Sequence, residues 1–135
     1  MNKFSLRIVE PSGLVFAEDI TQANACTTSG EITILARHAP LVSVLEIAPL
    51  TVKTGETTEH FGVYGGFIEV RENSNVVVLA DAAERQADMD IEKAKRVKKE
   101  TETKLEAMDE ESDEYQKLKD KLKRNQTRLK IHSSG

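Results

Sequence analysis

Residue types that mark several protein classes are scarce in this chain of 135 residues. It has one cysteine, Cys26, no tryptophan and three prolines. A single cysteine cannot form an internal disulfide, which excludes a disulfide-stapled secreted domain and favours a reducing compartment. The longest apolar run covers residues 76–80, whereas a membrane-spanning helix needs about 20 residues. The N-terminus shows no apolar stretch of signal-peptide length.

The charges divide the chain into two parts. Residues 1–87 hold 6 basic and 11 acidic side chains, with glycine, proline, threonine and valine at strand and turn spacing. Residues 88–135 hold 13 basic and 12 acidic side chains, and no glycine before Gly135. A segment with so many charged residues can bury only a narrow stripe of apolar side chains. This composition predicts an exposed helical element. We expect a sandwich domain over 1–87, a helical domain over 88–135 and a hinge at 82–88.

The first part is predicted to form a sheet. Apolar and polar residues alternate over 4–9, and β-branched runs follow over 41–47, 60–70 and 76–80. Short strands at roughly 8–12-residue spacing indicate an antiparallel sandwich or barrel. The pair Gly65–Gly66 lies within a strand and predicts a bulge or a close backbone approach. Cys26, in a weakly alternating segment, is expected to be a small core residue.

The second part is predicted to form a helical hairpin. Its weakly apolar positions recur every three or four residues on both sides of a polar turn at 109–114. Asp88 or Asp90 can cap the first helix. The hairpin either packs on the sandwich permanently or moves between partners. The apolar positions are Ile91, Ala94, Val97, Thr101, Leu105, Met108, Tyr115, Leu118, Leu122 and Leu129.

No catalytic or metal-binding constellation is recognisable. His38, His60 and His132 are far apart in the sequence, and no Cys-x-x-Cys or His-x-x-x-His spacing exists, so no metal site is expected. There is no Gly-x-Ser-x-Gly elbow and no phosphate-binding Gly-x-x-x-x-Gly-Lys loop. These features favour a binding or regulatory protein over an enzyme.

Three blocks of sequence, met in order along the chain, carry a family resemblance. They are Gly-Glu-Ile-Thr-Ile-Leu-Ala-Arg-His-Ala-Pro-Leu-Val at 30–42, His-Phe-Gly-Val-Tyr-Gly-Gly-Phe-Ile-Glu-Val at 60–70 and Val-Val-Leu-Ala-Asp-Ala-Ala-Glu at 77–84. Together they resemble the epsilon subunit of F-type ATP synthases. The resemblance implies a β-sandwich of about ten strands followed by two antiparallel helices. It also implies a non-catalytic subunit of the central rotor stalk, which couples proton or other ion transport to ATP synthesis.

The resemblance implies partners for the sandwich: the gamma subunit and the loops of the c-ring. Glu31, Arg37 and His38 are the candidate contacts, unless they merely decorate a surface turn. Ala36–Arg37 stands where the family has Pro-Gly. Alanine and arginine neither fix φ nor favour a positive φ, so a reshaped turn is expected.

The resemblance also implies that the hairpin regulates ATP hydrolysis by extending into the alpha–beta catalytic head. Seven cations and one acid lie between Lys117 and Lys130. Lys117, Lys121, Arg124 and Arg128 are the candidate inhibitory residues, although a solvated lysine face fits equally well. The chain is then a peripheral protein on the cytoplasmic face of the bacterial membrane, with no span of its own.

Some bacterial members of this family bind ATP on the folded hairpin, and this chain keeps part of their motif. No cofactor is required, and ATP is expected to bind weakly or not at all, because Lys93 and Glu100 stand where the family has arginine. The alternative to ATP binding is that Asp90 only caps a helix and that Lys93 is solvated. The positions that match the ATP contacts are Glu84, Asp90, Lys93, Ala94, Arg124 and Arg128.

Two other classes stay open from the residues alone. The basic C-terminal helix could serve a freestanding module that binds nucleic acid or an acidic protein. The net charge of −4 and the acidic stretch at 109–114 argue against nucleic acid. An enzyme on a small β-barrel is the third class, but no residue set indicates its chemistry.

Overall fold

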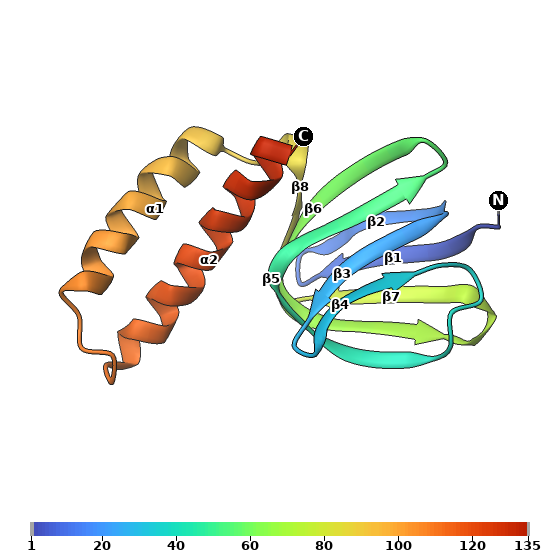
Figure 1. Ribbon diagram of the computed structural model, residues 1–135, viewed down its shortest axis with the longest axis horizontal. Coiled ribbons are helices and arrows are strands. Elements are labelled where there is room, and N and C mark those ends of the chain that lie inside the picture. Colours follow the sequence, from blue (N-terminus) through green and yellow to red (C-terminus); the bar gives the residue numbers. More distant parts are fainter. Residues whose placement is uncertain (1, 135) are drawn as a thin grey trace.

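The computed structural model describes residues 2–134, which form eight strands followed by two α-helices (Figure 1). Two short 3-10 turns, η1 (Glu72–Ser74) and η2 (Gln86–Asp88), flank the last strands. The helices are α1 (Ile91–Glu106) and α2 (Asp113–Ser134). The strands are β1 (Phe4–Glu10), β2 (Gly13–Ile20), β3 (Gln22–Thr27), β4 (Gly30–Ile34), β5 (Leu41–Thr54), β6 (Thr57–Arg71), β7 (Asn75–Ala80) and β8 (Ala83–Arg85). The predicted sandwich followed by a helical hairpin is confirmed.

The strands form one hydrogen-bonded path that folds over on itself. Its order is β2-β1-β7-β6-β5-β3-β4, with β8 paired to β6. Eight strands replace the expected ten or so, because β5 and β6 run on through the fold as single long strands. The pair β1–β7 is parallel, unlike the antiparallel pairs that surround it. A parallel pair needs a long crossover, which strands β2 to β6 supply.

A pair of glycines marks the place where the backbone of β6 lies very close to that of its antiparallel neighbour β7. The β5–β6 register runs from Leu45 opposite Gly66 directly to Ile47 opposite Tyr64. Gly65 and Gly66 have φ of 85° and 121°. A Cβ on Gly66 would lie 2.1 Å from the backbone oxygen of Leu79. The predicted close backbone approach at Gly65–Gly66 is confirmed.

The sandwich interior is filled by alternate apolar side chains from β1 to β7. Phe16 and Phe61 meet edge to face, with ring centroids 5.1 Å apart. The guanidinium of Arg85 lies 5.5 Å from each ring centroid and donates to the Val15 carbonyl at 2.9 Å. Strand β8 is therefore anchored to the core within the predicted hinge. Cys26 is half-buried rather than a core residue, because the strand alternation turns Ala25 and Thr27 inward instead.

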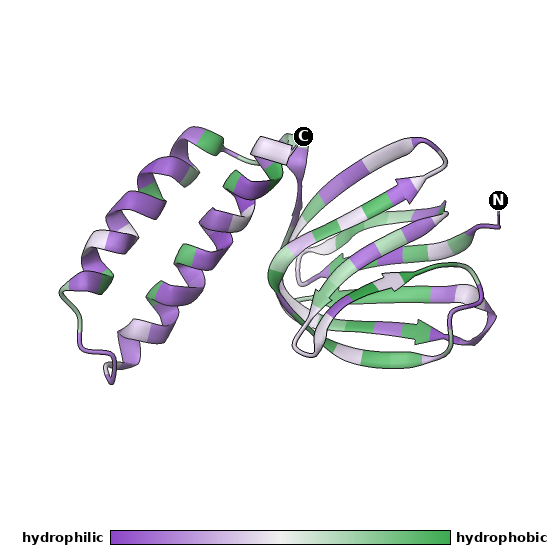
Figure 2. Ribbon diagram, in the orientation of Figure 1, coloured by the Kyte–Doolittle hydropathy of each residue, from purple (hydrophilic) through white to green (hydrophobic). Residues whose placement is uncertain are grey.

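Both helices of the hairpin are mostly hydrophilic, with scattered hydrophobic positions (Figure 2). Asp90, not Asp88, caps α1 by accepting from the Lys93 backbone N–H at 3.0 Å. The larger apolar side chains of the predicted stripe are only partly buried. The fully buried hairpin residues are Ala94, Thr101, Asn125, Thr127 and Ile131.

The buried polar side chains of the hairpin bond within their own helix. Thr101 Oγ1 donates to the Val97 carbonyl at 2.6 Å. The Asn125 side-chain amide donates to the Lys121 carbonyl at 2.9 Å, and Thr127 Oγ1 donates to the Lys123 carbonyl at 2.8 Å. Each helix therefore satisfies its own polar groups, and contact between the helices adds packing rather than hydrogen bonds.

Candidate regulatory site between hairpin and sandwich

A pocket of about 370 Å³ opens where the two helices meet the end of the sandwich. All six residues predicted as ATP contacts line it. Glu100 does not line it and forms a loose ion pair with Arg96 on α1, at 3.9 Å. The lining residues are Glu84, Asp88, Asp90, Lys93, Ala94, Val97, Lys121, Arg124, Asn125 and Arg128.

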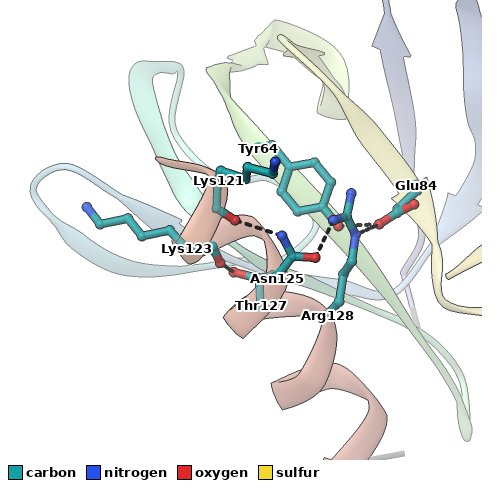
Figure 3. Close-up of polar contacts among 7 residues, drawn as sticks. All are labelled: Tyr64, Glu84, Lys121, Lys123, Asn125, Thr127 and Arg128. Carbon is teal, nitrogen blue, oxygen red and sulfur yellow. Dashed lines mark hydrogen bonds and ion pairs between the residues drawn. The ribbon is translucent and has the colours of Figure 1, made fainter. Parts of the chain in front are cut away.

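Beside this pocket, a cluster of polar side chains ties α2 to the sandwich (Figure 3). The Tyr64 hydroxyl donates to Glu84 Oε1 at 2.5 Å, and Arg128 Nε donates to the same oxygen. The Arg128 guanidinium lies over the Tyr64 ring, 5.0 Å from its centroid. Arg128 Nη1 also donates to Asn125 Oδ1 at 2.9 Å. We call Tyr64, Glu84 and Arg128 the clasp.

Sequence reasoning found two of the three clasp residues. It missed Tyr64, which comes from β6 and is far from both partners in sequence. The one available signal was a tyrosine at a strand position beside the glycine pair. A buried tyrosine needs a partner for its hydroxyl, but the sequence does not say which.

Tyr64 and Arg128 both have a raised pKa and keep their protons across neutral pH. Burial, reinforced by the hydrogen bond to Glu84, raises the pKa of Tyr64 far above its usual value. Burial is the largest single influence on the pKa of Arg128 and lowers it, but the hydrogen bond to Glu84 and the further interactions with Tyr64 and Glu84 together outweigh it, so this pKa is raised. A raised tyrosine pKa contributes stability that is present below about pH 10 and is lost as the pH rises toward the folded-state value.

The candidate inhibitory residues of α2 have different surroundings. Lys121, Arg124 and Arg128 line the pocket, whereas Lys117 lies nearer the hairpin turn, outside the pocket lining. Lys117 and Lys121 are exposed, while Arg124 is half-buried. The two arginines are therefore partly covered by the chain itself, whereas the lysines of α2 remain exposed.

The three candidate rotor contacts lie at opposite ends of β4. Glu31 is near its start and lines a second pocket, of about 260 Å³, with Lys130 and Ser134 of α2. Arg37 follows the far end of β4, where its backbone N–H donates to Ser74 Oγ at 3.2 Å. Arg37 itself adopts φ of 68°, so the turn keeps the positive φ that glycine favours. His38 is half-buried, with its Nδ1 2.7 Å from the Ala39 carbonyl oxygen.

An apolar row crosses the outer surface of the sandwich, and sequence reasoning missed it. The strand register places its members side by side across β5, β6, β7, β1 and β2. Phe67 is 51% exposed and Leu79 is 49% exposed. A contiguous apolar strip is typical of a protein interaction surface. The row consists of Val44, Phe67, Leu79, Val9 and Leu14.

Within residues 2–134, the structure shows neither a candidate metal centre nor a membrane-spanning helix. No group of three or more histidine, cysteine or acidic side chains in this part of the chain is placed to hold a metal ion. Neither of its helices combines the length and apolar character that crossing a bilayer requires.

Comparison with known proteins identifies the family. The model of the ATP synthase delta/epsilon chain β-sandwich domain matches residues 3–86. The ATP synthase epsilon chain of Halalkalibacterium halodurans is 34% identical over 131 residues, which cover 97% of this chain and 98% of that relative. The epsilon chain of Desulforamulus reducens is 44% identical over 108 residues, covering 80% and 81%.

Among solved structures, the fold matches a chain of the Euglena gracilis mitochondrial ATP synthase, in a complex of OSCP, F1 and c-ring. The TM-score is 0.83 at 21% identity, and the match covers 97% of this chain and 81% of that one. This likeness supports the fold over nearly the full length, including the hairpin.

A sandwich that carries an exposed apolar row and a polar, clasped hairpin defines a binding and regulatory class of protein. The comparisons then specify the class, and the chain belongs to the ATP synthase epsilon-chain family. The predicted identity as a non-catalytic subunit of ATP synthase is confirmed.

Proposed function

We propose that the sandwich is the docking module of the central stalk and that the hairpin is a mobile regulator of ATP hydrolysis. The thin, polar attachment of the hairpin carries this proposal. Only Ala94 and Ile131 among its apolar side chains are fully buried. Burying so little apolar surface leaves the folded and released states close in free energy, as a switch requires.

The partners follow from the surfaces. We assign the apolar row to the gamma subunit, because exposed apolar side chains are removed from water when an apolar surface of a partner covers them. Arg37 and His38 are proposed to contact the loops of the c-ring. The basic face of α2, of which only Arg124 and Arg128 are partly covered while the hairpin is folded, suits an acidic surface of the alpha–beta head after release. The chain acts on the cytoplasmic side of a bacterial membrane, where it is held by its partners.

Removing the hairpin tests this function. A chain that ends at residue 87, assembled into the complete ATP synthase, is expected to raise ATP hydrolysis roughly 3–10-fold, because states a few kcal/mol apart leave a large inhibited fraction. The measurement is steady-state hydrolysis of the reconstituted complex. The control replaces Lys117 and Lys121 by glutamine in the full chain, and is expected to give a smaller rise. Equal hydrolysis with and without the hairpin would contradict the regulatory proposal.

ATP is proposed as a weak regulatory ligand of the pocket. Four cations there face three acids, and Arg128 is already paired with Glu84. At 1 mM ATP, the melting temperature of the isolated chain is expected to rise by less than about 2 °C. The variant Lys93→Arg introduces a further guanidinium into the pocket lining and is expected to show a larger rise, with GTP as the control. A wild-type rise above about 5 °C would refute weak binding.

A further inference from the structure

We propose that the clasp of Tyr64, Glu84 and Arg128 holds the hairpin on the sandwich without any bound ligand, so that release of the regulator begins with its rupture. This inference rests on the proposed function, since it concerns how the same hairpin is held. It assigns a role to Tyr64, which lies outside the pocket lining.

The clasp joins three separate elements at one carboxylate oxygen. Tyr64 comes from β6, Glu84 from β8 and Arg128 from α2, and both donors bond Glu84 Oε1. Tyr64 is 6% exposed, whereas Glu84 and Arg128 side chains are each 25% exposed. Partial burial strengthens a charge-assisted contact relative to a surface ion pair. The clasp thereby joins α2 to the sandwich through polar contacts to one carboxylate oxygen.

One pocket cation that a bound anion would use, Arg128, is already engaged. Arg128 donates to Glu84 and to Asn125, and its guanidinium covers the Tyr64 ring. An anionic ligand in the pocket would have to compete with Glu84 for Arg128. The folded state therefore needs no ligand to neutralise Arg128, because the chain supplies its own carboxylate.

Further contact between α2 and the sandwich lies on both sides of Arg128, at Thr127, which lines a pocket against β5, and at Ile131 near the end of the helix. Ile131 is 1% exposed and lines the second pocket together with Lys130 and Ser134. Cys26 lines the same pocket from β3. Departure of α2 would therefore uncover Cys26, which is half-buried and is the only cysteine in the chain.

Cys26 thus provides a built-in reporter of hairpin release. The full-length isolated chain is treated with a thiol-reactive dye, and the rate of labelling is measured at neutral pH. Tyr64→Phe is expected to raise this rate about tenfold and Arg128→Gln by more, because each removes a hydrogen bond to a charged group. In wild type, added NaCl is expected to speed labelling by screening the ion pair, an effect that Arg128→Gln should lose.

Matched controls are available in the chain. Tyr115→Phe changes the other tyrosine, which lies on α2 outside the clasp, and Lys119→Gln removes an exposed cation of the same helix. Both are expected to label at nearly the wild-type rate. Ile131→Ala is expected to label faster and shows that the reporter responds to loss of α2 packing. Cys26→Ser gives the background, and circular dichroism verifies that each variant is folded.

The proposal is overturned if Tyr64→Phe and Arg128→Gln label at the wild-type rate while Ile131→Ala labels faster. It is also overturned if wild-type Cys26 reacts as fast as in the chain that ends at residue 87. Neither result changes the outcome of removing the hairpin from the assembled synthase. Failure of the clasp is therefore distinguishable from failure of the regulatory proposal.

Discussion

The substitution Gly66→Ala is expected to destabilise the sandwich by about 3–5 kcal/mol, since it combines a strained φ with a collision that nothing can relieve. The added Cβ would lie 2.1 Å from the Leu79 carbonyl oxygen and 2.8 Å from the Ala80 Cα. Both atoms belong to the backbone of β7, so no side-chain rotation makes room. The midpoint of thermal unfolding is expected to fall by at least about 10 °C.

Gly30→Ala is the matched control for this prediction. Gly30 has φ of 119°, close to the 121° of Gly66, but its added Cβ would meet nothing within 4 Å. Its cost is expected to be about 1–2 kcal/mol, from backbone strain alone. Denaturant unfolding of both variants separates strain from collision. Equal losses of unfolding free energy for the two variants would show that the backbones of β6 and β7 can move apart at Gly66.

The substitution Phe67→Asp is expected to weaken binding to the gamma subunit roughly 100-fold while leaving the sandwich folded. Phe67 lies in the middle of the apolar row, with Val44 opposite on β5 and Leu79 opposite on β7. Large aromatic side chains at the centre of an interface carry much of its binding energy, and a buried unpaired carboxylate adds a penalty. Because Phe67 is 51% exposed in the isolated chain, its replacement costs little stability.

The measurement is the affinity of the isolated chain for purified gamma subunit, for example by titration calorimetry. Leu35→Asp is the control, because Leu35 is 52% exposed and follows β4 outside the row. It makes the same kind of change at a similar exposure and is expected to bind normally. If Phe67→Asp binds the gamma subunit with unchanged affinity, the apolar row is not the gamma interface.

The residues predicted the architecture because local patterns decided it. Alternation marked the strands, charge density marked the hairpin, and the position of Gly65–Gly66 anticipated the close backbone approach. The number of strands was less predictable. No local signal says that β5 and β6 continue through the fold of the sheet, or that β1 pairs in parallel with β7 across most of the sandwich.

The candidate site was predictable only in part, for a different reason. Its six residues follow from a resemblance along the chain, and the structure brings all six to one pocket. Tyr64 and the apolar row depend on contacts between distant strands. A half-exposed phenylalanine such as Phe67 looks like a core residue in the sequence, because the alternation of β6 does not state which face is inward.

The self-contained hydrogen bonding of the two helices has a consequence for the energetics of opening. When α1 and α2 part, Thr101, Asn125 and Thr127 keep their bonds to the carbonyls of Val97, Lys121 and Lys123. None of these three side chains loses its partner when the helices part, so they add no barrier beyond rupture of the clasp. If the hairpin moves as proposed, its helices can separate and close again without local unfolding.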